Sequence, residues 1–554
     1  MKKGDIVECV ALKINFPNKC ICKTDEGEDV IVKNAIPGQR LSVMISKKRS
    51  GKAEGRIVEV IKPADGELVP SNCEHFGICG GCAYQCLPYD KQLEIKSGQI
   101  RDLMTPVLGE KLFDDIFEGV KSSPKQFEYR NKMEFSFGDE FKGGPLSLGM
   151  HKKGSFYDIV PVEKCAIVSE EFRQILSVTR KYFDDNKTPF FHKDHTGYLR
   201  HLLVRRAEKT GEILVDLVTS TQAKELGIDE PTLLQGWVDE LLKVVKTAGI
   251  LHTLNDAFAD VVEDHGTTVL YGQSYFTENL LGLNFKITPF SFFQTNTLGA
   301  ELLYETAREF ISTGADGAEV YDLYSGTGTI AQVISPAAKH VTGVEIVAEA
   351  VEAAKENAAL NGLNNCDFIA GDVLKVLDDI AEKPDYIILD PPRDGIHPKA
   401  LTKIIDYGVD SLVYISCKPT SLVRDLAVFM EHGYMPTRMV CVDMFPGTVH
   451  VETVCLLSKL HEAKHHVSVK LDMEEMDITA AESKATYEEI KQYVAEHNGG
   501  MKISSLYIAQ VKRKCGIELG ENFNLPKSEN SRQPQCPAEK ENAIVEALKV
   551  FKMI

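Results

Sequence analysis

Two short segments of the sequence carry residue types that suit covalent chemistry. Residues 414–420 read Tyr-Ile-Ser-Cys-Lys-Pro-Thr and contain Cys417, and the earlier residues 389–393 read Leu-Asp-Pro-Pro-Arg. A thiolate is the strongest common nucleophile among protein side chains. A thiol beside such a loop, at the mouth of an α/β sheet, therefore predicts covalent addition to a flat heterocycle. The alternative is that Cys417 is a small buried apolar residue at a strand end, a common place for a free cysteine.

A glycine-rich segment before this cysteine predicts a nucleotide-like cofactor. Gly326 and Gly328 lie in residues 322–329 (Asp-Leu-Tyr-Ser-Gly-Thr-Gly-Thr), between an expected strand and an expected helix. Glycines at this place let the backbone approach a ligand closely, and the amino end of the helix offers a polar site. Glu345 ends the next strand, where a carboxylate accepts hydrogen bonds from ribose hydroxyls. Asp372 follows the third strand, where a carboxylate meets an adenine amino group.

The glycine pattern alone also fits a dinucleotide cofactor. Asp322 stands four residues before Gly326, and an Asp-Pro-Pro loop follows at residues 390–392. These two additions favour S-adenosylmethionine as the cofactor.

Three cysteines lie close together in a glycine-rich stretch of the amino-terminal part. Cys73, Cys79 and Cys82 fall within ten residues, and Cys165 offers a remote fourth thiol. Four thiolates suit zinc or an iron–sulfur cluster, and their spacing does not decide between the two. The whole chain has 14 cysteines, which we do not expect to form a disulfide framework in a cytosolic protein.

The composition is that of a soluble multidomain protein. The 554 residues predict three or four domains. The sequence has no run of eighteen or more apolar residues and no signal-like start, so we expect a cytoplasmic protein without a membrane segment. The net charge of −18 argues against a protein that coats nucleic acids indiscriminately, because such binding depends on neutralising phosphates. A structured RNA held by local basic patches is compatible with this charge.

Alternating strand-like segments in residues 1–62 predict a small β-barrel of the OB type. Residues 1–60 contain 12 Lys and Arg against 8 Asp and Glu, in contrast to the acidic chain as a whole. A basic barrel of this type commonly binds oligonucleotides. The alternative is that the basic residues near 47–52 form only a solvated hairpin end.

The middle of the chain divides by pattern into two further domains. Residues 63–290 mix strands and helices, which predicts a central α+β domain. Residues 291–459 alternate apolar strands with helices, which predicts a doubly wound, mostly parallel α/β sheet. The expected strands of that sheet are residues 320–323, 341–344, 366–369, 386–389 and 412–415.

Residues 460–554 predict a helical tail of unknown role. The expected helices are residues 486–497, 505–514 and about 540–551. Lys512, Arg513 and Lys514 make the second of these helices either an RNA-binding accessory or part of a small capping domain.

Six motifs occur together in the order found in one enzyme family. They are residues 73–82, 292–296, 322–328, 390–393, 416–419 and 450–452. In this order they resemble the RNA uracil-C5 methyltransferases. With the barrel and the cysteine group, the chain is most similar to the bacterial 23S rRNA (uracil-5-)-methyltransferases, which carry a TRAM-type, OB-like barrel. The resemblance covers residues 1 to about 459 and implies a Rossmann-like class I methyltransferase domain.

The resemblance also implies two cofactors and their ligands. In that family the cysteine group holds a [4Fe-4S] cluster, which implies as ligands Cys73, Cys79, Cys82 and Cys165. The family's contacts with S-adenosylmethionine fall on Gln294, Tyr324, Glu345 and Asp390.

The reaction that the resemblance implies takes place on uridine. The target base must leave its stack, and the Cys417 thiolate then adds to C6, so that C5 attacks the methyl group of the cofactor. Glu452 matches the base that removes the C5 proton before the thiol leaves. Asp390 and Arg393 are expected to orient the pyrimidine. Lys418 stands where many relatives have Asn, a change expected to alter loop contacts and not the thiol chemistry.

Several basic and aromatic residues are candidates for binding RNA. Candidates for contacts with the RNA backbone are Arg130, Lys132, Arg205 and Arg206, and for the last two a solvated strand is the alternative. Phe292 or Phe293 is a candidate for stacking on a base, with a place in the core as the alternative. We expect a monomer that modifies 23S rRNA, with tRNA as the alternative substrate.

Two other functions compete with this interpretation. A methyltransferase acting on an amino nitrogen usually has a polar residue before Pro-Pro, an aromatic residue after it and no covalent cysteine. Asp390, Arg393 and Cys417 disfavour that function. A non-catalytic RNA-binding or ribosome-assembly factor is disfavoured because Cys417 and Glu452 are both present.

Overall fold

A computed structural model gives the fold of the chain. It describes residues 1–49, 52–68, 71–155, 157–192, 195–257, 261–312, 317–379, 383–460, 490–491, 493–494, 501, 503–514 and 536–550. The chain forms two compact units, Met1–Val469 and Lys470–Ile554. Within the described ranges, no helix combines the length and the apolar character that a membrane span requires.

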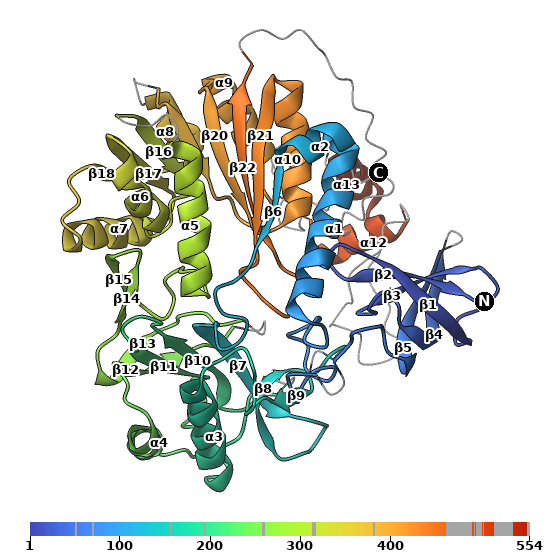
Figure 1. The fold of residues 1–554 in the computed structure, drawn as a ribbon. Coiled ribbons are helices and arrows are strands. Elements are labelled where there is room, and N and C mark those ends of the chain that lie inside the picture. The colour runs from blue at the N-terminus through green and yellow to red at the C-terminus, as the bar shows by residue number, and fades with distance from the viewer. Residues whose placement is uncertain are drawn as a thin grey trace. The chain divides into compact units, whose positions relative to one another are not determined.

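The amino-terminal residues form a closed five-stranded barrel (Figure 1). Its strands are β1 (Ile6–Asn15), β2 (Lys19–Thr24), β3 (Asp29–Lys33), β4 (Arg40–Arg49) and β5 (Lys52–Lys62), in the order β1-β2-β3-β5-β4. Side chains alternate between the interior and solvent with the strand period of two. The core includes Cys9, Cys20 and Cys22. The predicted barrel is confirmed, and these three cysteines are part of its apolar interior.

The central region is built on a seven-stranded sheet. In spatial order its strands are β13 (Thr267–Gly272), β12 (Gly249–Leu254), β11 (Ile213–Thr219), β10 (Leu199–Arg206), β7 (Lys132–Asp139), β8 (Leu146–His151) and β9 (Ile159–Pro161). Helices α3 (Glu170–Asp185) and α4 (Glu230–Val244) belong to the same core. Phe172, Ile175, Leu176 and Phe183 recur at helical spacing on α3, which gives that helix its buried face.

The carboxyl-terminal part of the first unit contains an eight-stranded sheet. Its order is β18-β17-β16-β19-β20-β22-β21-β6. The strands are β16 (Glu319–Leu323), β17 (His340–Glu345), β18 (Cys366–Ala370), β19 (Tyr386–Leu389), β20 (Ser411–Ser416), β21 (Tyr434–Val442), β22 (Glu452–Lys459) and β6 (Phe117–Lys121). Strands β16 to β20 pair in parallel, and β22 is antiparallel to both of its neighbours. The predicted doubly wound sheet is confirmed, with all five expected strands in place.

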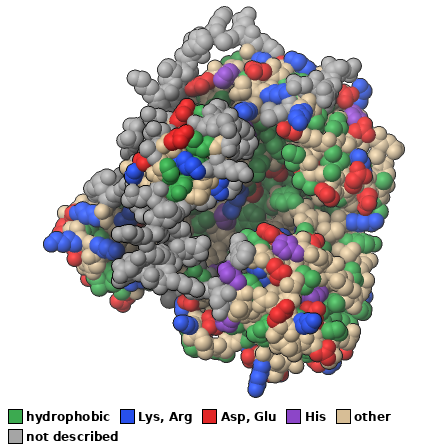
Figure 2. Space-filling view, turned by 180° about the vertical axis from the view of Figure 1, so that it is seen from behind, with side chains coloured by type: hydrophobic (Ala, Val, Ile, Leu, Met, Phe, Trp, Pro, Cys, Tyr) green, Lys and Arg blue, Asp and Glu red, His purple; other side chains and the backbone are tan. Residues whose placement is uncertain are grey.

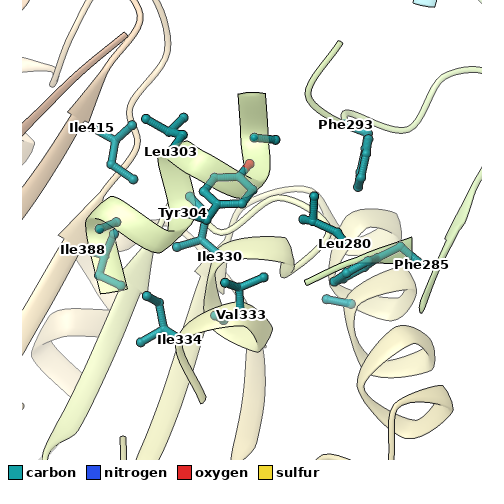
Figure 3. Close-up of a cluster of buried hydrophobic side chains, with 14 of the residues drawn as sticks. Leu280, Phe285, Phe293, Leu303, Tyr304, Ile330, Val333, Ile334, Ile388 and Ile415 are labelled. Carbon is teal, nitrogen blue, oxygen red and sulfur yellow. The ribbon is translucent and has the colours of Figure 1, made fainter. Parts of the chain in front are cut away.

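Helices connect and cover these strands. They are α5 (Thr297–Ser312), α6 (Thr329–Ile334), α7 (Ala348–Leu360), α8 (Val373–Asp379), α9 (Pro398–Tyr407) and α10 (Pro419–Glu431). Leu303 and Tyr304 of α5 lie between α6 and the sheet residues Ile388 and Ile415 in one apolar cluster (Figure 3). This packing holds the carboxyl ends of β16, β19 and β20 in one place. In a doubly wound sheet, ligands bind at that edge.

Segments that precede the sheet in sequence also pack against it. Helix α1 (Tyr89–Leu108) is followed by α2 (Glu110–Ile116) and by β6, which runs parallel to β21 at the sheet edge (Figure 1). The hairpin of β14 (Phe276–Leu280) and β15 (Leu283–Ile287) shares the core of the same sheet. The early and late parts of the first unit are therefore joined by shared strands and a shared core.

The second unit contains α12 (Ser505–Lys514) and α13 (Ala538–Val550). Ile508 and Val511 of α12 and Ile544 and Leu548 of α13 lie in one apolar cluster. The helix predicted over 486–497 lies mostly outside the described residues, as does the polar stretch before it. Lys512 is 4% exposed, and Lys514 pairs with Glu541 at 2.8 Å. Burial disfavours Lys512 as an RNA ligand.

Candidate active site

Strand pairing brings Cys417 and Glu452 to the same edge of the sheet. Strand β20 pairs with β22 in antiparallel register, and Ser416 lies opposite Thr453. Cys417 follows β20 directly and Glu452 begins β22, so the two side chains come from adjacent positions at the end of the ladder. Cys417 is half-buried and Glu452 is 4% exposed. Residues 35 positions apart in sequence thus share one site.

Burial, together with the nearby carboxyl groups, favours the neutral forms of these two side chains. Burial raises the pKa of Glu452 to about 8, and the nearby Asp390 adds to the shift, whereas Arg393 opposes it. Burial raises the pKa of Asp390 to about 7. Burial, followed by the charges of Glu452 and Asp390, raises the pKa of Cys417 to about 11, and Arg393 again opposes the shift. Shifted carboxyl groups of this kind are typical of sites that move protons.

Helix α10 holds both loops that carry these groups. The Ser421 hydroxyl donates to the Arg393 carbonyl at 2.8 Å, which fixes the loop after Pro392. The buried Asp425 carboxylate accepts hydrogen bonds from the Ile396 amide at 2.9 Å and from the Tyr414 hydroxyl at 2.7 Å. Asp425 was not a predicted site residue, because no local pattern marks a helix carboxylate that bonds to two other elements.

At the other end of the site, Glu345 fixes the glycine-rich loop. Its carboxylate accepts hydrogen bonds from the Gly326 amide at 3.0 Å and the Val347 amide at 2.9 Å. At Gly328, φ is +72° and a Cβ would lie 2.5 Å from the Phe368 ring, so only glycine fits there. Tyr324 also has a positive φ, of 70°, which is uncommon outside glycine. Strained backbone of this kind is often found at ligand sites.

The cofactor candidates Asp372, Asp390 and Gln294 surround the same loop region. Burial and then the charge of Asp372 raise the pKa of Tyr324 to about 12, so Asp372 lies near that tyrosine. Burial raises the pKa of Tyr304 well above its usual value; Asp390 adds to the shift and a hydrogen bond with Gln294 opposes it. The predicted cofactor residues are therefore grouped at the carboxyl edge of the sheet.

Asp322 provides a test of whether this region fits S-adenosylmethionine. One carboxylate oxygen accepts a hydrogen bond from the Ala331 amide at 3.0 Å. The other is buried and has no hydrogen-bond partner among the described residues. Burial, followed by the charge of Asp390, raises the pKa of Asp322 well above its usual value. The buried Asp322 carboxyl group and the nearby half-buried Asp390 suit a ligand that carries positive charge, as the ammonium and sulfonium groups of S-adenosylmethionine do.

The two phenylalanines before Gln294 have different environments. Phe293 is 6% exposed and packs against Phe285 with ring centroids 6.2 Å apart. Phe292 is 67% exposed. Of the pair, Phe292 alone is free to stack on a base. The Asn131 side chain donates to the Gln294 carbonyl at 3.0 Å and fixes this segment.

The basic residues predicted to contact RNA differ in their exposure and in the contacts that they make within the protein. The Arg130 guanidinium donates to the Lys132 carbonyl at 3.1 Å and lies 5.7 Å from the Phe445 ring centroid. Lys132 pairs with Glu134 at 2.9 Å. Arg393 is exposed. A hollow near the centre of the molecular face in Figure 2 contains hydrophobic side chains together with basic and histidine side chains.

The prediction for Arg205 and Arg206 as RNA contacts is wrong for Arg205. Its side chain is 1% exposed and donates to the carbonyls of Thr288, Pro289 and Ser291 at 2.7–3.1 Å. Arg205 holds the segment before Phe292 in place. Arg206 is partly buried and pairs with Glu171 and Glu208. Both side chains therefore make contacts within the protein.

The four predicted metal-ligand cysteines lie near one another. Burial raises the pKa of Cys82 to about 12, and the charges of Cys165, Cys79 and Cys73 add to the shift. Backbone contacts fix their loop, since the Gly80 amide donates to the His151 carbonyl at 3.0 Å. Four soft thiols match the donor chemistry of an iron–sulfur cluster. Among the described residues, however, no group of three or more His, Cys, Asp or Glu side chains is arranged to hold a metal ion, so the cluster is not confirmed.

Comparison with known proteins identifies the family. Residues 262–460 match the sequence model described as tRNA (Uracil-5-)-methyltransferase. An uncharacterized RNA methyltransferase of Clostridium tetani is 48% identical over 459 residues, which cover 82% of this chain and 98% of that protein. The chain belongs to the RNA uracil-C5 methyltransferase family. A second uncharacterized RNA methyltransferase, from Caldanaerobacter subterraneus, is 46% identical over 467 residues, covering 83% of this chain and all of that protein.

A solved structure shows the same fold. The Pyrococcus abyssi tRNA (uracil-54, C5)-methyltransferase, in complex with S-adenosyl-L-homocysteine, aligns with a TM-score of 0.63 and 22% identity. The alignment covers 81% of this chain and 100% of that one. The family resemblance, the enzyme class and the carboxyl-terminal methyltransferase fold are confirmed. The use of S-adenosylmethionine stays a prediction.

Proposed function

We propose that this methyltransferase acts in the cytoplasm, as a monomer, on C5 of a specific uridine in 23S rRNA, through covalent addition of Cys417 to C6. The observation that supports this most directly is the position of Cys417 and Glu452 at the ends of the paired strands β20 and β22. A nucleophile and a carboxylate on one side of a base are what addition at C6 and proton removal at C5 require.

The chain's own residues account for the first step. The target uridine leaves its stack and enters the site, where Phe292 is exposed for base stacking. The Cys417 thiolate forms a bond to C6 and places negative charge on C5 and O4 of the uracil ring. Burial and the carboxyl groups of Glu452 and Asp390 raise the pKa of the thiol, and Arg393 offsets part of this shift in favour of the thiolate. When bound, S-adenosylmethionine supplies the electrophilic methyl group that the activated C5 attacks, and the fixed glycine loop sets the distance for that attack.

Glu452 then completes the reaction. After C5 has received the methyl group it still carries its hydrogen, and the Glu452 carboxylate takes this proton. The electrons of the C5–H bond restore the C5–C6 double bond as the bond from C6 to the Cys417 sulfur breaks. The thiolate returns and the methylated uridine is released. A carboxylate with a pKa raised to about 8 is a stronger base than an ordinary glutamate.

The covalent mechanism is tested with RNA that contains 5-fluorouridine. Fluorine at C5 cannot be removed as a proton, so the wild-type enzyme is expected to remain bound to this RNA in an adduct that survives denaturing electrophoresis. Cys417→Ala should form no adduct and show no methyl transfer, while it still binds S-adenosylmethionine. Cys366→Ala, at the amino end of β18, is the control and should behave like the wild type. Methyl transfer by Cys417→Ala would contradict the mechanism.

A tRNA substrate is the second candidate, because the matching family model is described as a tRNA methyltransferase. Mapping 5-methyluridine by mass spectrometry in 23S rRNA and tRNA from a deletion strain separates the two. Loss of a 23S rRNA site supports the proposal, and loss confined to tRNA overturns the rRNA assignment.

We also propose that Cys73, Cys79, Cys82 and Cys165 hold a [4Fe-4S] cluster. The support is the chemistry of four neighbouring thiols and the family resemblance. No step of the methyl transfer depends on this cluster.

A further inference from the structure

The loop that leads into Glu452 is held from outside the methyltransferase sheet. Residues 443–451 connect β21 to β22, and Glu452 is the first residue of β22, paired with Val442. At the start of this loop, Lys96 of α1 pairs with Asp443 at 2.6 Å, and both side chains are 0% exposed. Lys96 also donates to the Phe445 carbonyl at 3.2 Å. A buried ion pair of this kind fixes the loop to α1.

Gly447, in the middle of the loop, receives contacts from the cysteine segment. Its carbonyl accepts hydrogen bonds from the Ala83 amide at 2.9 Å and the Tyr84 amide at 2.8 Å, directly after Cys82. Its own amide donates to the Gln92 side chain at 2.7 Å. Both backbone polar groups of Gly447 are therefore bonded to residues more than 350 positions earlier in the chain.

The fit at Gly447 leaves no space for a side chain. Its φ is +78°, and a Cβ at this position would lie 2.5 Å from the Gln85 side-chain nitrogen. Gln85 is 2% exposed, and the same nitrogen lies 3.8 Å from the Cys82 sulfur. Besides these hydrogen bonds, the loop and the cysteine segment thus touch through the buried Gln85 side chain.

We propose that residues 83–84 and Gln92 form a latch on Gly447 that sets the position of Glu452 for removal of the C5 proton. Gln92 is then a positioning residue, and it acts through the loop. The inference rests on the proposed function, in which Glu452 is the base. Glu452 is at the end of the β21–β22 ladder. Sheet pairing fixes the residues that follow it in the chain, and the loop fixes the residues that precede it. A general base must reach its proton within hydrogen-bond distance, and small displacements are costly.

The test uses Gly447→Ala, whose added methyl group collides with Gln85. We expect a fall in kcat of roughly 10- to 100-fold, with KM for RNA and the affinity for S-adenosylmethionine changed less than about twofold. We also expect an adduct between enzyme and normal RNA, because the thiol cannot leave until the proton is removed. The control is Gly433→Ala, which has a similar φ of +85° and nothing within 4 Å of its Cβ. This control should keep normal turnover.

A second variant separates positioning from general damage. In Gly447→Ala combined with Gln85→Ala, the colliding side chain is absent, so much of the lost kcat should return and the adduct should decrease. Normal turnover in a folded Gly447→Ala variant would overturn the latch. Loss of activity without an adduct, with no recovery in the double variant, would also overturn it.

Glu452→Gln, measured in the same assay, shows whether a negative result concerns the latch alone or the role of Glu452 as the base. An adduct with Glu452→Gln but not with Gly447→Ala overturns the latch alone. No adduct with either variant overturns Glu452 as the base, and the latch with it.

Discussion

The pair formed by Cys417 and Glu452 and the group of four cysteines are positioned by different kinds of structure. Cys417 and Glu452 stand at the ends of paired strands, so the hydrogen bonds of the sheet place them without any ligand. The four cysteines come from loops, and in the described part of the chain no three metal-ligating side chains are arranged around a common point. Paired strands can preform a site, whereas the arrangement of thiols on loops depends more on a metal when such thiols bind one.

Replacing Glu452, the proposed base, is the strongest way to break the sheet-edge site. Glu452→Gln should lower turnover by roughly 10²- to 10⁴-fold, the usual contribution of a general base. Methyl transfer should still occur once per enzyme, so a methylated adduct should persist in denaturing electrophoresis. Glu431→Gln, an exposed residue at the end of α10, is the control and should turn over normally. Unchanged turnover in Glu452→Gln would mean that another group takes the proton.

The cysteine group is tested by its metal content. Anaerobically purified protein should be brown and contain about four irons per chain. Cys79→Ser should lose this absorbance, because a thiolate ligand is missing, while Cys366→Ser should keep it. The sheet-edge site should be less affected, with S-adenosylmethionine affinity close to that of the wild type. Stoichiometric zinc in anaerobic protein would contradict the iron–sulfur assignment.

The pH dependence follows from the raised pKa of Glu452, which is about 8. Below this value Glu452 is mostly protonated and cannot accept the C5 proton. The kcat for single-site methylation should therefore rise by up to about tenfold per pH unit from pH 6 and level off near pH 8. Rates are measured at saturating RNA and cofactor, with folding at each pH checked by circular dichroism. A flat profile across this range would show that proton removal by Glu452 does not limit turnover.

Substitutions in the barrel should have the smallest effect of the changes considered, and that effect should be on RNA binding. Ala83, Tyr84, Cys86 and Leu87 share the barrel core, so deleting residues 1–62 would also disturb the latch. Lys47 and Lys48, exposed on β4, can be replaced without that damage. Lys47→Ala with Lys48→Ala should weaken RNA binding and lower the slope of log affinity against log salt by roughly 0.7–0.9 per lost phosphate contact.

A control with the same change in charge completes the barrel experiment. Lys181→Ala with Lys243→Ala removes two lysines that pair with neighbouring carboxylates on α3 and α4. RNA affinity and salt slope should stay unchanged there. If both double variants behave alike, the barrel contributes net charge only and no direct phosphate contact.

Local sequence patterns predicted much of the fold. Strand alternation predicted the barrel, and apolar strands separated by helices predicted the doubly wound sheet, since both depend on the period of the backbone. Motifs also indicated Cys417, Glu452 and the glycine-rich loop as parts of one site. The contributions of Asp425 and Tyr304 were not predicted, because single polar residues on helices carry no local signal.

By itself the sequence determined which residues have the chemistry for this reaction: a thiol, a carboxylate and a glycine loop in a recognisable order. The tertiary structure alone decided how they are used. It buried Arg205 and Phe293 while leaving Phe292 exposed, and it placed Gly447 against the cysteine segment. The Gly447 contacts join segments more than 350 residues apart in the sequence. Burial and pKa values depend on such contacts, because desolvation and charge act through space and not along the chain.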